Sequence, residues 1–328
     1  MDFLVQQGVQ WIIAIQGLGG WLEAPMKFFS FLGVKEFYFL ILPLLYWCID
    51  STLGLRVAMI LVTSTSVNYF FKLWFAGPRP YWVSARVKAF SSESSFGIPS
   101  GHAQNAVGVW GMMADGVRKR SAWIAAFTIT FLIGFSRMYL GVHFLHDVLA
   151  GWLIGGILLW AFMRFWNPVT AWLKTKTLTQ QITMAFVLSL IMIAIGSFST
   201  GRLAGYAFPE EWKTNALRAG PSVPAPVSME DAITSAGTLF GVAVGLAWIM
   251  SQGGYQAAGP IEKRALRFVI GLIGVLILWR GLALVFPGGD ELIPYILRYV
   301  RYTLVGFWIM GGAPWLFFRF KLADAPKM

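Results

Sequence analysis

The chain is poor in cysteine, histidine and charge. It has 328 residues with one cysteine and three histidines, and aspartate, glutamate, lysine and arginine together make up only 12% of it. The single Cys48 excludes an intrachain disulfide, and so few sulfur and imidazole ligands exclude a recognisable zinc site. Hydrophobic residues make up 57% and mean hydropathy is +0.64, which excludes a soluble domain of this size. No basic segment precedes Phe3-Leu4-Val5, so we expect no cleaved signal peptide.

The net charge of +11 is compatible with nucleic acid or with anionic lipid as a partner. The basic residues fall between apolar segments rather than in one stretch, which favours control of membrane topology over nucleic-acid binding. We therefore expect a lipid bilayer and a membrane lipid carrying a phosphate headgroup as partners, no nucleic acid, and no cofactor or metal. The sequence makes no prediction of oligomeric state.

Apolar segments long enough to cross, or nearly cross, a hydrocarbon core of about 30 Å recur along the chain. They lie at about 32–49, 55–76, 103–117, 121–141, 146–166, 182–198, 233–251, 267–286 and 299–318. The predicted fold is therefore all-α, a polytopic transmembrane helix bundle of about nine spans. Residues 3–22 are predicted to form a helix lying in the interface, anchored by Trp11 and Trp21. Gly237, Gly241 and Gly245 predict a smooth helix face against a closely packed neighbour.

Lysine and arginine are distributed unequally between alternate loops, which predicts orientation. One side, expected to be cytoplasmic, receives Arg118-Lys119-Arg120, Arg164, Lys174, Lys176, Lys263, Arg264, Arg267, Arg319, Lys321 and Lys327. The other side receives three polar segments between residues 72 and 147, the Pro-rich stretch 199–232 and the Asp290-Glu291 turn. We expect a bacterial inner membrane protein whose polar segments face the periplasm or cell exterior and whose C-terminus is cytoplasmic.

The first polar segment contains Lys72 and Arg79, which lies between Pro78 and Pro80. The prolines must end the helix and fix the backbone on both sides of a planar guanidinium that suits phosphate oxygens. Lys72 alone is equally well explained as a lysine that extends to the membrane surface. Together the two side chains predict an anion site.

The second segment, Pro99-Ser100-Gly101-His102, immediately precedes a helical stretch. Ser100 is therefore predicted to be the helix N-cap, with the following amides pointing at an anion. Gly101 permits close approach of the backbone to an oxyanion. His102 stands beside it with an unperturbed pKa near neutrality.

The third segment runs from Ser136-Arg137 to Asp147. His143 and Asp147 are four residues apart, so on a helix they share a face and the carboxylate accepts a hydrogen bond from Nδ1. That contact fixes the tautomer and leaves Nε2 as a nucleophile. Arg137 adds a third cation for a phosphoryl group. Asp147 is expected to point away from His146, which we interpret as structural.

These three segments resemble the signature motifs of the type 2 phosphatidic acid phosphatase (PAP2) family: Lys-x6-Arg-Pro, Pro-Ser-Gly-His and Ser-Arg-x5-His-x3-Asp. The resemblance covers roughly residues 55–166. It implies a metal-independent phosphatase with His143 as nucleophile, Asp147 as its orienting partner and His102 as the acid for the leaving oxygen. It implies that Lys72, Arg79, Ser100, Gly101 and Arg137 hold the phosphoryl oxygens. Ser91-Ser92-Glu93-Ser94-Ser95, between two motifs, is interpreted as a flexible lip.

The predicted organisation is thus an N-terminal interfacial segment (1–31), a PAP2-type catalytic transmembrane core (32–168) and additional C-terminal helices (169–328) with an outward loop at 199–232. The first functional hypothesis is hydrolysis of a lipid phosphate or diphosphate monoester, such as a phosphatidyl phosphate or undecaprenyl pyrophosphate, through a phosphohistidine. The alternative is a sugar-phosphate phosphatase, because Phe71-Lys72 through Trp82 and the number of spans resemble the glucose-6-phosphatase branch; Asp147 fits the lipid pattern better. A hypothesis of a different class is a membrane transporter whose charges line a solute path.

Overall fold

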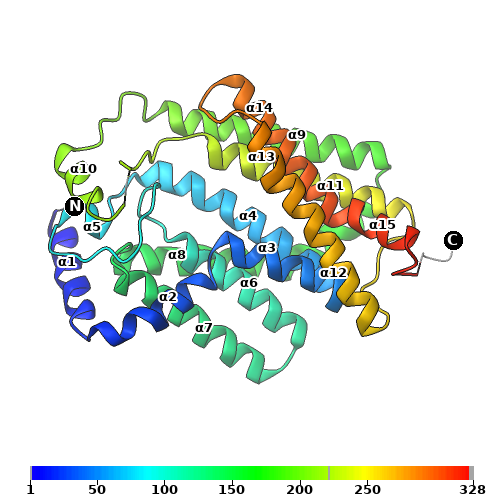
Figure 1. Ribbon diagram of the computed structural model, residues 1–328, viewed down its shortest axis with the longest axis horizontal. Coiled ribbons are helices and arrows are strands. Elements are labelled where there is room, and N and C mark those ends of the chain that lie inside the picture. Colours follow the sequence, from blue (N-terminus) through cyan, green and yellow to red (C-terminus); the bar gives the residue numbers. More distant parts are fainter. Residues whose placement is uncertain (1, 221, 325–328) are drawn as a thin grey trace. The chain divides into compact units, whose positions relative to one another are not determined.

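The computed structural model describes residues 2–220 and 222–324, and this part of the chain is helical, with no strands. Pro221 of the predicted outward loop and the last four residues lie outside it. The α-helices are α1 Asp2–Gln16, α2 Glu23–Phe31, α3 Lys35–Leu44, α4 Ser51–Phe75, α5 Pro80–Val83, α6 Gly101–Val117, α7 Arg120–Tyr139, α8 Leu145–Lys174, α9 Leu178–Gly201, α10 Glu210–Ala216, α11 Glu230–Ser251, α12 Ile261–Leu276, α13 Leu282–Val285, α14 Leu292–Phe307 and α15 Ala313–Arg319 (Figure 1). A 3₁₀ turn η1 covers Gly20–Leu22, and π-helical turns cover η2 Leu45–Ile49, η3 Ile277–Gly281 and η4 Trp308–Gly312.

Each predicted span overlaps helical residues, in some cases two or three successive helical elements. Among the described residues, fewer helices are long and apolar enough to cross a membrane than the nine expected. Six described helices meet that requirement, or up to seven if the bent pair of Gly20–Phe31 and Glu36–Ile49 forms one span. α6 has 17 residues, and α14 carries Arg298 and Arg301 within 16 residues. The count of nine is therefore not confirmed, because short or charged helices contribute to an apolar pattern without the length or hydropathy of a full span.

The chain divides into two compact units that interleave along the sequence. Unit 1 contains Met1–Tyr38, Val67–Trp160 and Phe198–Ser228, and unit 2 contains Phe39–Ser66, Ala161–Ser197 and Met229–Met328. All three polar segments belong to unit 1, together with most of the predicted outward loop 199–232. The predicted domain boundaries, which follow the sequence in order, stay a prediction.

Glycine spacing positions the helices within each unit. A Cβ at Gly151 or Gly155 of α8 would lie 2.6 Å from the carbonyl oxygens of Ser100 or Gln104, so α8 packs directly on the first turn of α6. In unit 2, the predicted smooth face of α11 meets α14. A Cβ at Gly241 would lie 2.1 Å from the Thr303 carbonyl oxygen, and Gly237 and Gly245 contact α14 in the same way.

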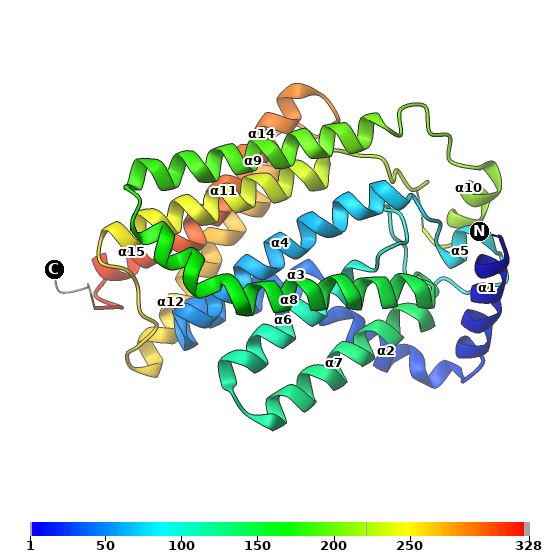
Figure 2. The same cartoon turned by 180° about the vertical axis from the view of Figure 1, so that it is seen from behind.

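The N-terminal helix α1 is not among the helices that qualify as spans. It runs across the direction of the first half of α8 (Figures 1 and 2). Trp11 is 53% exposed and Trp21, in η1, is 74% exposed. The Gln16 amide donates to the carbonyls of Lys88 and Tyr139, which fixes the end of α1 against unit 1. The predicted interfacial segment stays a prediction.

Candidate active site

The end of α4 and the start of α5 position the first two cations. α4 ends where Ala76 adopts a φ of 46°, and Pro80 occupies the first turn of α5, so Arg79 is its extended N-cap residue. Lys72 donates to the Phe96 carbonyl and is 9% exposed, so it does not extend to the membrane surface. Arg79 is 1% exposed and donates to the carbonyls of Ser95 (2.6 Å) and Phe96 (3.1 Å).

The second segment begins α6 as predicted. Ser100 is the N-cap residue and its hydroxyl accepts from the Ala103 amide at 3.4 Å. Its own amide donates to the Asp147 carbonyl at 2.9 Å, which joins the second and third segments. A Cβ at Gly101 would lie 3.0 Å from the side-chain oxygen of Asn68, so the glycine permits that close approach. The Nε2 atom of His102 is buried and has no hydrogen-bond partner among the described residues.

The third segment brings His143 and Asp147 together, but not as two residues of one helix. His143 lies in the extended stretch before α8, and Asp147 is in the first turn. The Asp147 Oδ2 atom accepts from the Phe144 amide at 2.9 Å and lies 3.3 Å from His143 Nδ1. The carboxylate therefore caps α8 from its third residue and orients the imidazole at the same time. Asp147 Oδ1 lies 3.3 Å from His146 Nε2, so the expectation that Asp147 points away from His146 is wrong.

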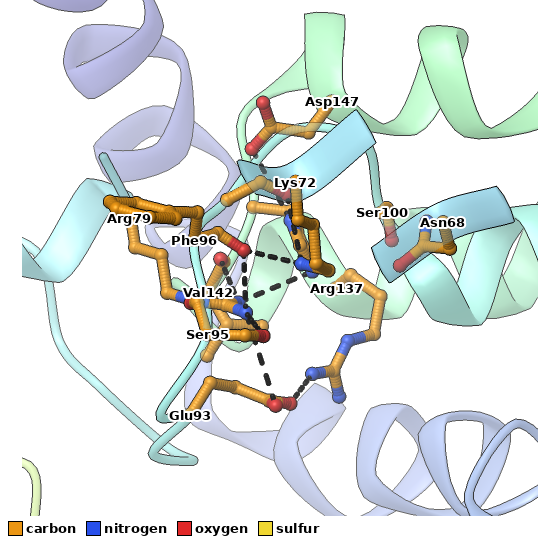
Figure 3. A network of polar contacts seen from close by, with 12 residues as sticks. Asn68, Lys72, Arg79, Glu93, Ser95, Phe96, Ser100, Arg137, Val142 and Asp147 are labelled. Atoms are coloured by element: carbon orange, nitrogen blue, oxygen red, sulfur yellow. Dashed lines mark hydrogen bonds and ion pairs between the residues drawn. The ribbon is translucent and has the colours of Figure 1, made fainter. Parts of the chain in front are cut away.

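The other nitrogen of His143 faces a cation. Arg79 Nη1 lies 3.3 Å from His143 Nε2 and also donates to the Val142 carbonyl at 2.9 Å (Figure 3). A guanidinium only donates, so Nε2 accepts and Nδ1 carries the proton given to Asp147. That is the tautomer expected of a nucleophilic Nε2. The His143 side chain is buried, with 1% of its surface exposed.

Arg137 makes two contacts that the motifs alone do not predict. Its guanidinium donates to the Ser30 hydroxyl of α2 at 2.5 Å. It also forms an ion pair with the Glu93 carboxylate (Figure 3). Arg137 Nε is buried without a partner among the described residues. The segment interpreted as a flexible lip therefore supplies the carboxylate of the cation cluster. A lone acidic residue between two cation-bearing motifs was the available signal.

The charges of the cluster shift the pKa values of its neighbours. Burial alone would raise the pKa of the Glu93 carboxyl, but Arg137 and the other cations outweigh burial and lower it to about 2. Burial, followed by Arg137, lowers the pKa of His102 to about 3. Burial, followed by Arg79, holds the pKa of His143 well below its usual range. Both imidazoles are thus neutral near pH 7, as a histidine nucleophile must be before attack.

Two further parts of unit 1 support the site. The Asn68 amide donates to the Pro99 carbonyl (3.2 Å) and to Gln104 Oε1 (2.9 Å), which holds the second segment against α4. The predicted outward loop covers α5: Asn215 donates to the Trp82 carbonyl at 2.9 Å, and the Phe208 ring packs edge-on to Trp82 with centroids 5.0 Å apart. The predicted site residues thus share unit 1 with a loop from outside the motif region.

Comparison with known families agrees with the three motifs and extends the match beyond them. The PAP2 superfamily matches residues 53–171, and a PAP2 superfamily phosphatase transmembrane extension matches residues 233–325. Phosphatidylglycerophosphatase B of Bacillus subtilis is 31% identical over 161 residues, which cover 44% of this chain and 75% of that protein. The chain belongs to the PAP2 superfamily. It is a membrane phosphatase of this family, a hydrolase of phosphate esters, which favours an enzyme over the transporter alternative.

This PAP2 protein is also similar to a glucose-6-phosphatase in sequence and to a solved structure of the superfamily. Glucose-6-phosphatase 3 of Bos taurus is 26% identical over 362 aligned positions, which cover 100% of this chain and 99% of that protein. The crystal structure of a transmembrane PAP2-type phosphatidylglycerolphosphate phosphatase from Bacillus subtilis is 28% identical, with a TM-score of 0.42, and covers 50% of this chain and 87% of that one. A phosphatidylglycerophosphatase and a glucose-6-phosphatase are therefore both among its relatives in sequence.

Proposed function

We propose that this PAP2 phosphatase hydrolyses a phosphate monoester through a phosphohistidine on His143. The supporting observation is the placement of His143 between Asp147 at Nδ1 and Arg79 at Nε2. Attack by Nε2 forms the P–N bond while the bond from phosphorus to the leaving oxygen breaks. Asp147 stabilises the positive charge that the imidazole acquires. Lys72, Arg79 and Arg137, with the Ser100 and Gly101 backbone, stabilise the negative charge of the phosphoryl oxygens.

His102 handles the proton in both halves of the reaction. It protonates the leaving oxygen in the first half and accepts a proton from the attacking water in the second, when the P–N bond breaks. Burial and nearby cations lower its pKa to about 3 in the free protein. A dianionic phosphoryl group beside those cations opposes their effect, so substrate binding raises the pKa of His102 towards the value an acid catalyst needs.

The proposed substrate is a lipid phosphate or diphosphate monoester, of the phosphatidyl phosphate or polyprenyl diphosphate type. Asp147 fits the lipid-phosphatase pattern, and the chain is 31% identical to phosphatidylglycerophosphatase B over 161 residues, which cover 75% of that protein. We further propose that the site faces outward, towards periplasm or cell exterior, with a cytoplasmic C-terminus, because alternate loops differ in lysine and arginine content.

A sugar phosphate is the second candidate substrate. The observation that favours it is the alignment with glucose-6-phosphatase 3, which spans 100% of this chain, whereas that with phosphatidylglycerophosphatase B spans 44%. The longer alignment includes the loop that packs on Trp82. Under this alternative, that loop contributes to recognition of the alcohol.

A small panel of substrates separates the two candidates. Phosphate release is measured in detergent from a polyprenyl diphosphate, phosphatidic acid, phosphatidylglycerol phosphate and glucose 6-phosphate. The lipid proposal expects kcat/KM for one of the three lipids to exceed that for glucose 6-phosphate. The reverse order establishes the sugar candidate, and no phosphate release from any of the four would contradict the proposed activity.

A further inference from the structure

The Glu93 carboxylate faces two of the cations that the proposed mechanism assigns to the phosphoryl oxygens, Arg79 and Arg137. One carboxylate oxygen pairs with Arg137 Nη2, and the other lies 4.0 Å from Arg79 Nη2 (Figure 3). Among the described residues, no other carboxylate pairs with either arginine. The two guanidinium side chains are 1–2% exposed, whereas the Glu93 side chain is 27% exposed. A partly exposed anion thus covers two buried cations.

The Glu93 carboxylate and a phosphoryl group compete for the guanidinium of Arg137. A guanidinium has five N–H donors. In Arg137, Nη1 donates to Ser30 and Nη2 to Glu93, and only Nε is left buried without a partner. A planar bidentate contact with phosphate uses two nitrogens of the fork. Nη1 and Nη2 each keep one further N–H, but a phosphoryl group bound there would meet the Glu93 carboxylate as a like charge, so full bidentate contact is favoured when that carboxylate leaves.

The surroundings of Glu93 favour movement of its side chain over movement of its backbone. The Tyr81 hydroxyl accepts from the Glu93 amide at 3.0 Å and donates to the Glu93 carbonyl at 3.1 Å. This pair of bonds ties the Glu93 backbone to α5. The side chain has rotatable bonds of its own and an exposed edge, so it can turn outward while the backbone stays bound.

We propose that Glu93 is a displaceable counterion of the phosphate-binding cations. Its carboxylate pairs with Arg137 when no phosphate is bound, and dianionic phosphate displaces it from Arg137. This inference rests on the proposed function. Glu93 also discriminates by charge: a monoester dianion competes well with a carboxylate, whereas a phosphodiester monoanion carries the same single charge as Glu93 and competes poorly. The low pKa of Glu93, about 2, keeps this competitor ionised across the working pH range.

The test measures binding of inorganic phosphate to the full chain in detergent, by calorimetry and by competitive inhibition of p-nitrophenyl phosphate hydrolysis. Glu93→Gln keeps the shape and removes the charge. We expect Kd and Ki for phosphate to fall at least about fivefold, with KM lowered and kcat nearly unchanged. Hydrolysis of bis(p-nitrophenyl) phosphate, a monoanionic diester, is expected to rise relative to the monoester. Glu210→Gln is the matched control, because the Glu210 side chain is exposed and its ion pair within the described part of the chain is with Lys213. It is expected to leave both constants unchanged.

A second variant keeps the inference testable if Glu93→Gln does not fold. Tyr81→Phe removes the tie to the Glu93 backbone and lowers the effective concentration of the carboxylate at Arg137. It is expected to tighten phosphate binding by a smaller factor than Glu93→Gln.

The outcomes separate this inference from the proposed function. Unchanged or weaker phosphate binding in Glu93→Gln, with a loss of kcat, would show that Glu93 merely orients Arg137, and the inference would be overturned while the enzyme remains a phosphatase. The same holds if Tyr81→Phe weakens phosphate binding. If the unaltered protein neither releases phosphate from a substrate nor binds inorganic phosphate, the proposed function is overturned, and this inference with it.

Discussion

Asp147→Asn should separate the charge of the carboxylate from its position. In the structure, a single oxygen, Oδ2, both accepts from the Phe144 amide (2.9 Å) and faces His143 Nδ1 (3.3 Å). An asparagine oxygen is held at that place by the Phe144 amide, because its NH₂ group cannot accept from that donor. The tautomer of His143 is then preserved and only the negative charge is lost. Hydrogen bonds to charged groups exceed neutral ones by about 1–2 kcal/mol, which corresponds to a decrease in kcat of roughly 5- to 30-fold.

Asp147→Ala removes the charge, the cap and the acceptor together. It is expected to reduce kcat by about 10³-fold or more, since the imidazole loses its orienting partner. Loss of the cap on α8 costs about 1 kcal/mol of stability. The assay is kcat for p-nitrophenyl phosphate in detergent, with thermal unfolding of both variants as a control for folding. An equal loss of kcat in the two variants would contradict this prediction. It would show either that the substituted side-chain amide does not hold its oxygen at the position of Oδ2, or that the negative charge accounts for the whole effect.

The remaining predictions concern the histidines and the reaction conditions. His143→Ala should abolish phosphate release, and appreciable residual turnover in a folded variant would exclude it as nucleophile. His102→Ala should slow esters of poor leaving groups more than p-nitrophenyl phosphate, and equal losses on both would argue against an acid at the leaving oxygen. Activity should be complete in excess EDTA, whereas loss that a divalent metal restores would overturn the metal-independent mechanism. Unfolded His102 binds a proton with a pKa of 6.5 and folded His102 only near 3, so the unfolded state takes up more protons in this window. The apparent Tm in detergent should therefore fall as pH is lowered from about 6.5 towards 4.5, with a shallower slope in His102→Asn; identical slopes would contradict this assignment.

Three differences between expectation and structure have physical causes. The spacing of His143 and Asp147 predicts two residues of one helix, yet the contact forms across the start of α8, because a residue just before a helix also lies near its third position. Apolar patterns indicate helices but not whether each one crosses a bilayer, so six or up to seven helices of the described residues qualify as spans instead of nine. A serine-rich segment was interpreted as flexible because local composition does not show that Glu93 meets a buried arginine.

The helical class, the N-cap at Ser100, the breaks at Pro78 and Pro80 and the glycine face of α11 can all be predicted from the sequence, because such features depend on residues a few positions apart. The motif residues that unit 1 brings together can be predicted in the same way. Their contacts are visible only in the folded protein. Arg137 meets Glu93 across 44 positions and Ser30 across 107. Such pairs follow from helix packing and desolvation of charge, which no local pattern encodes.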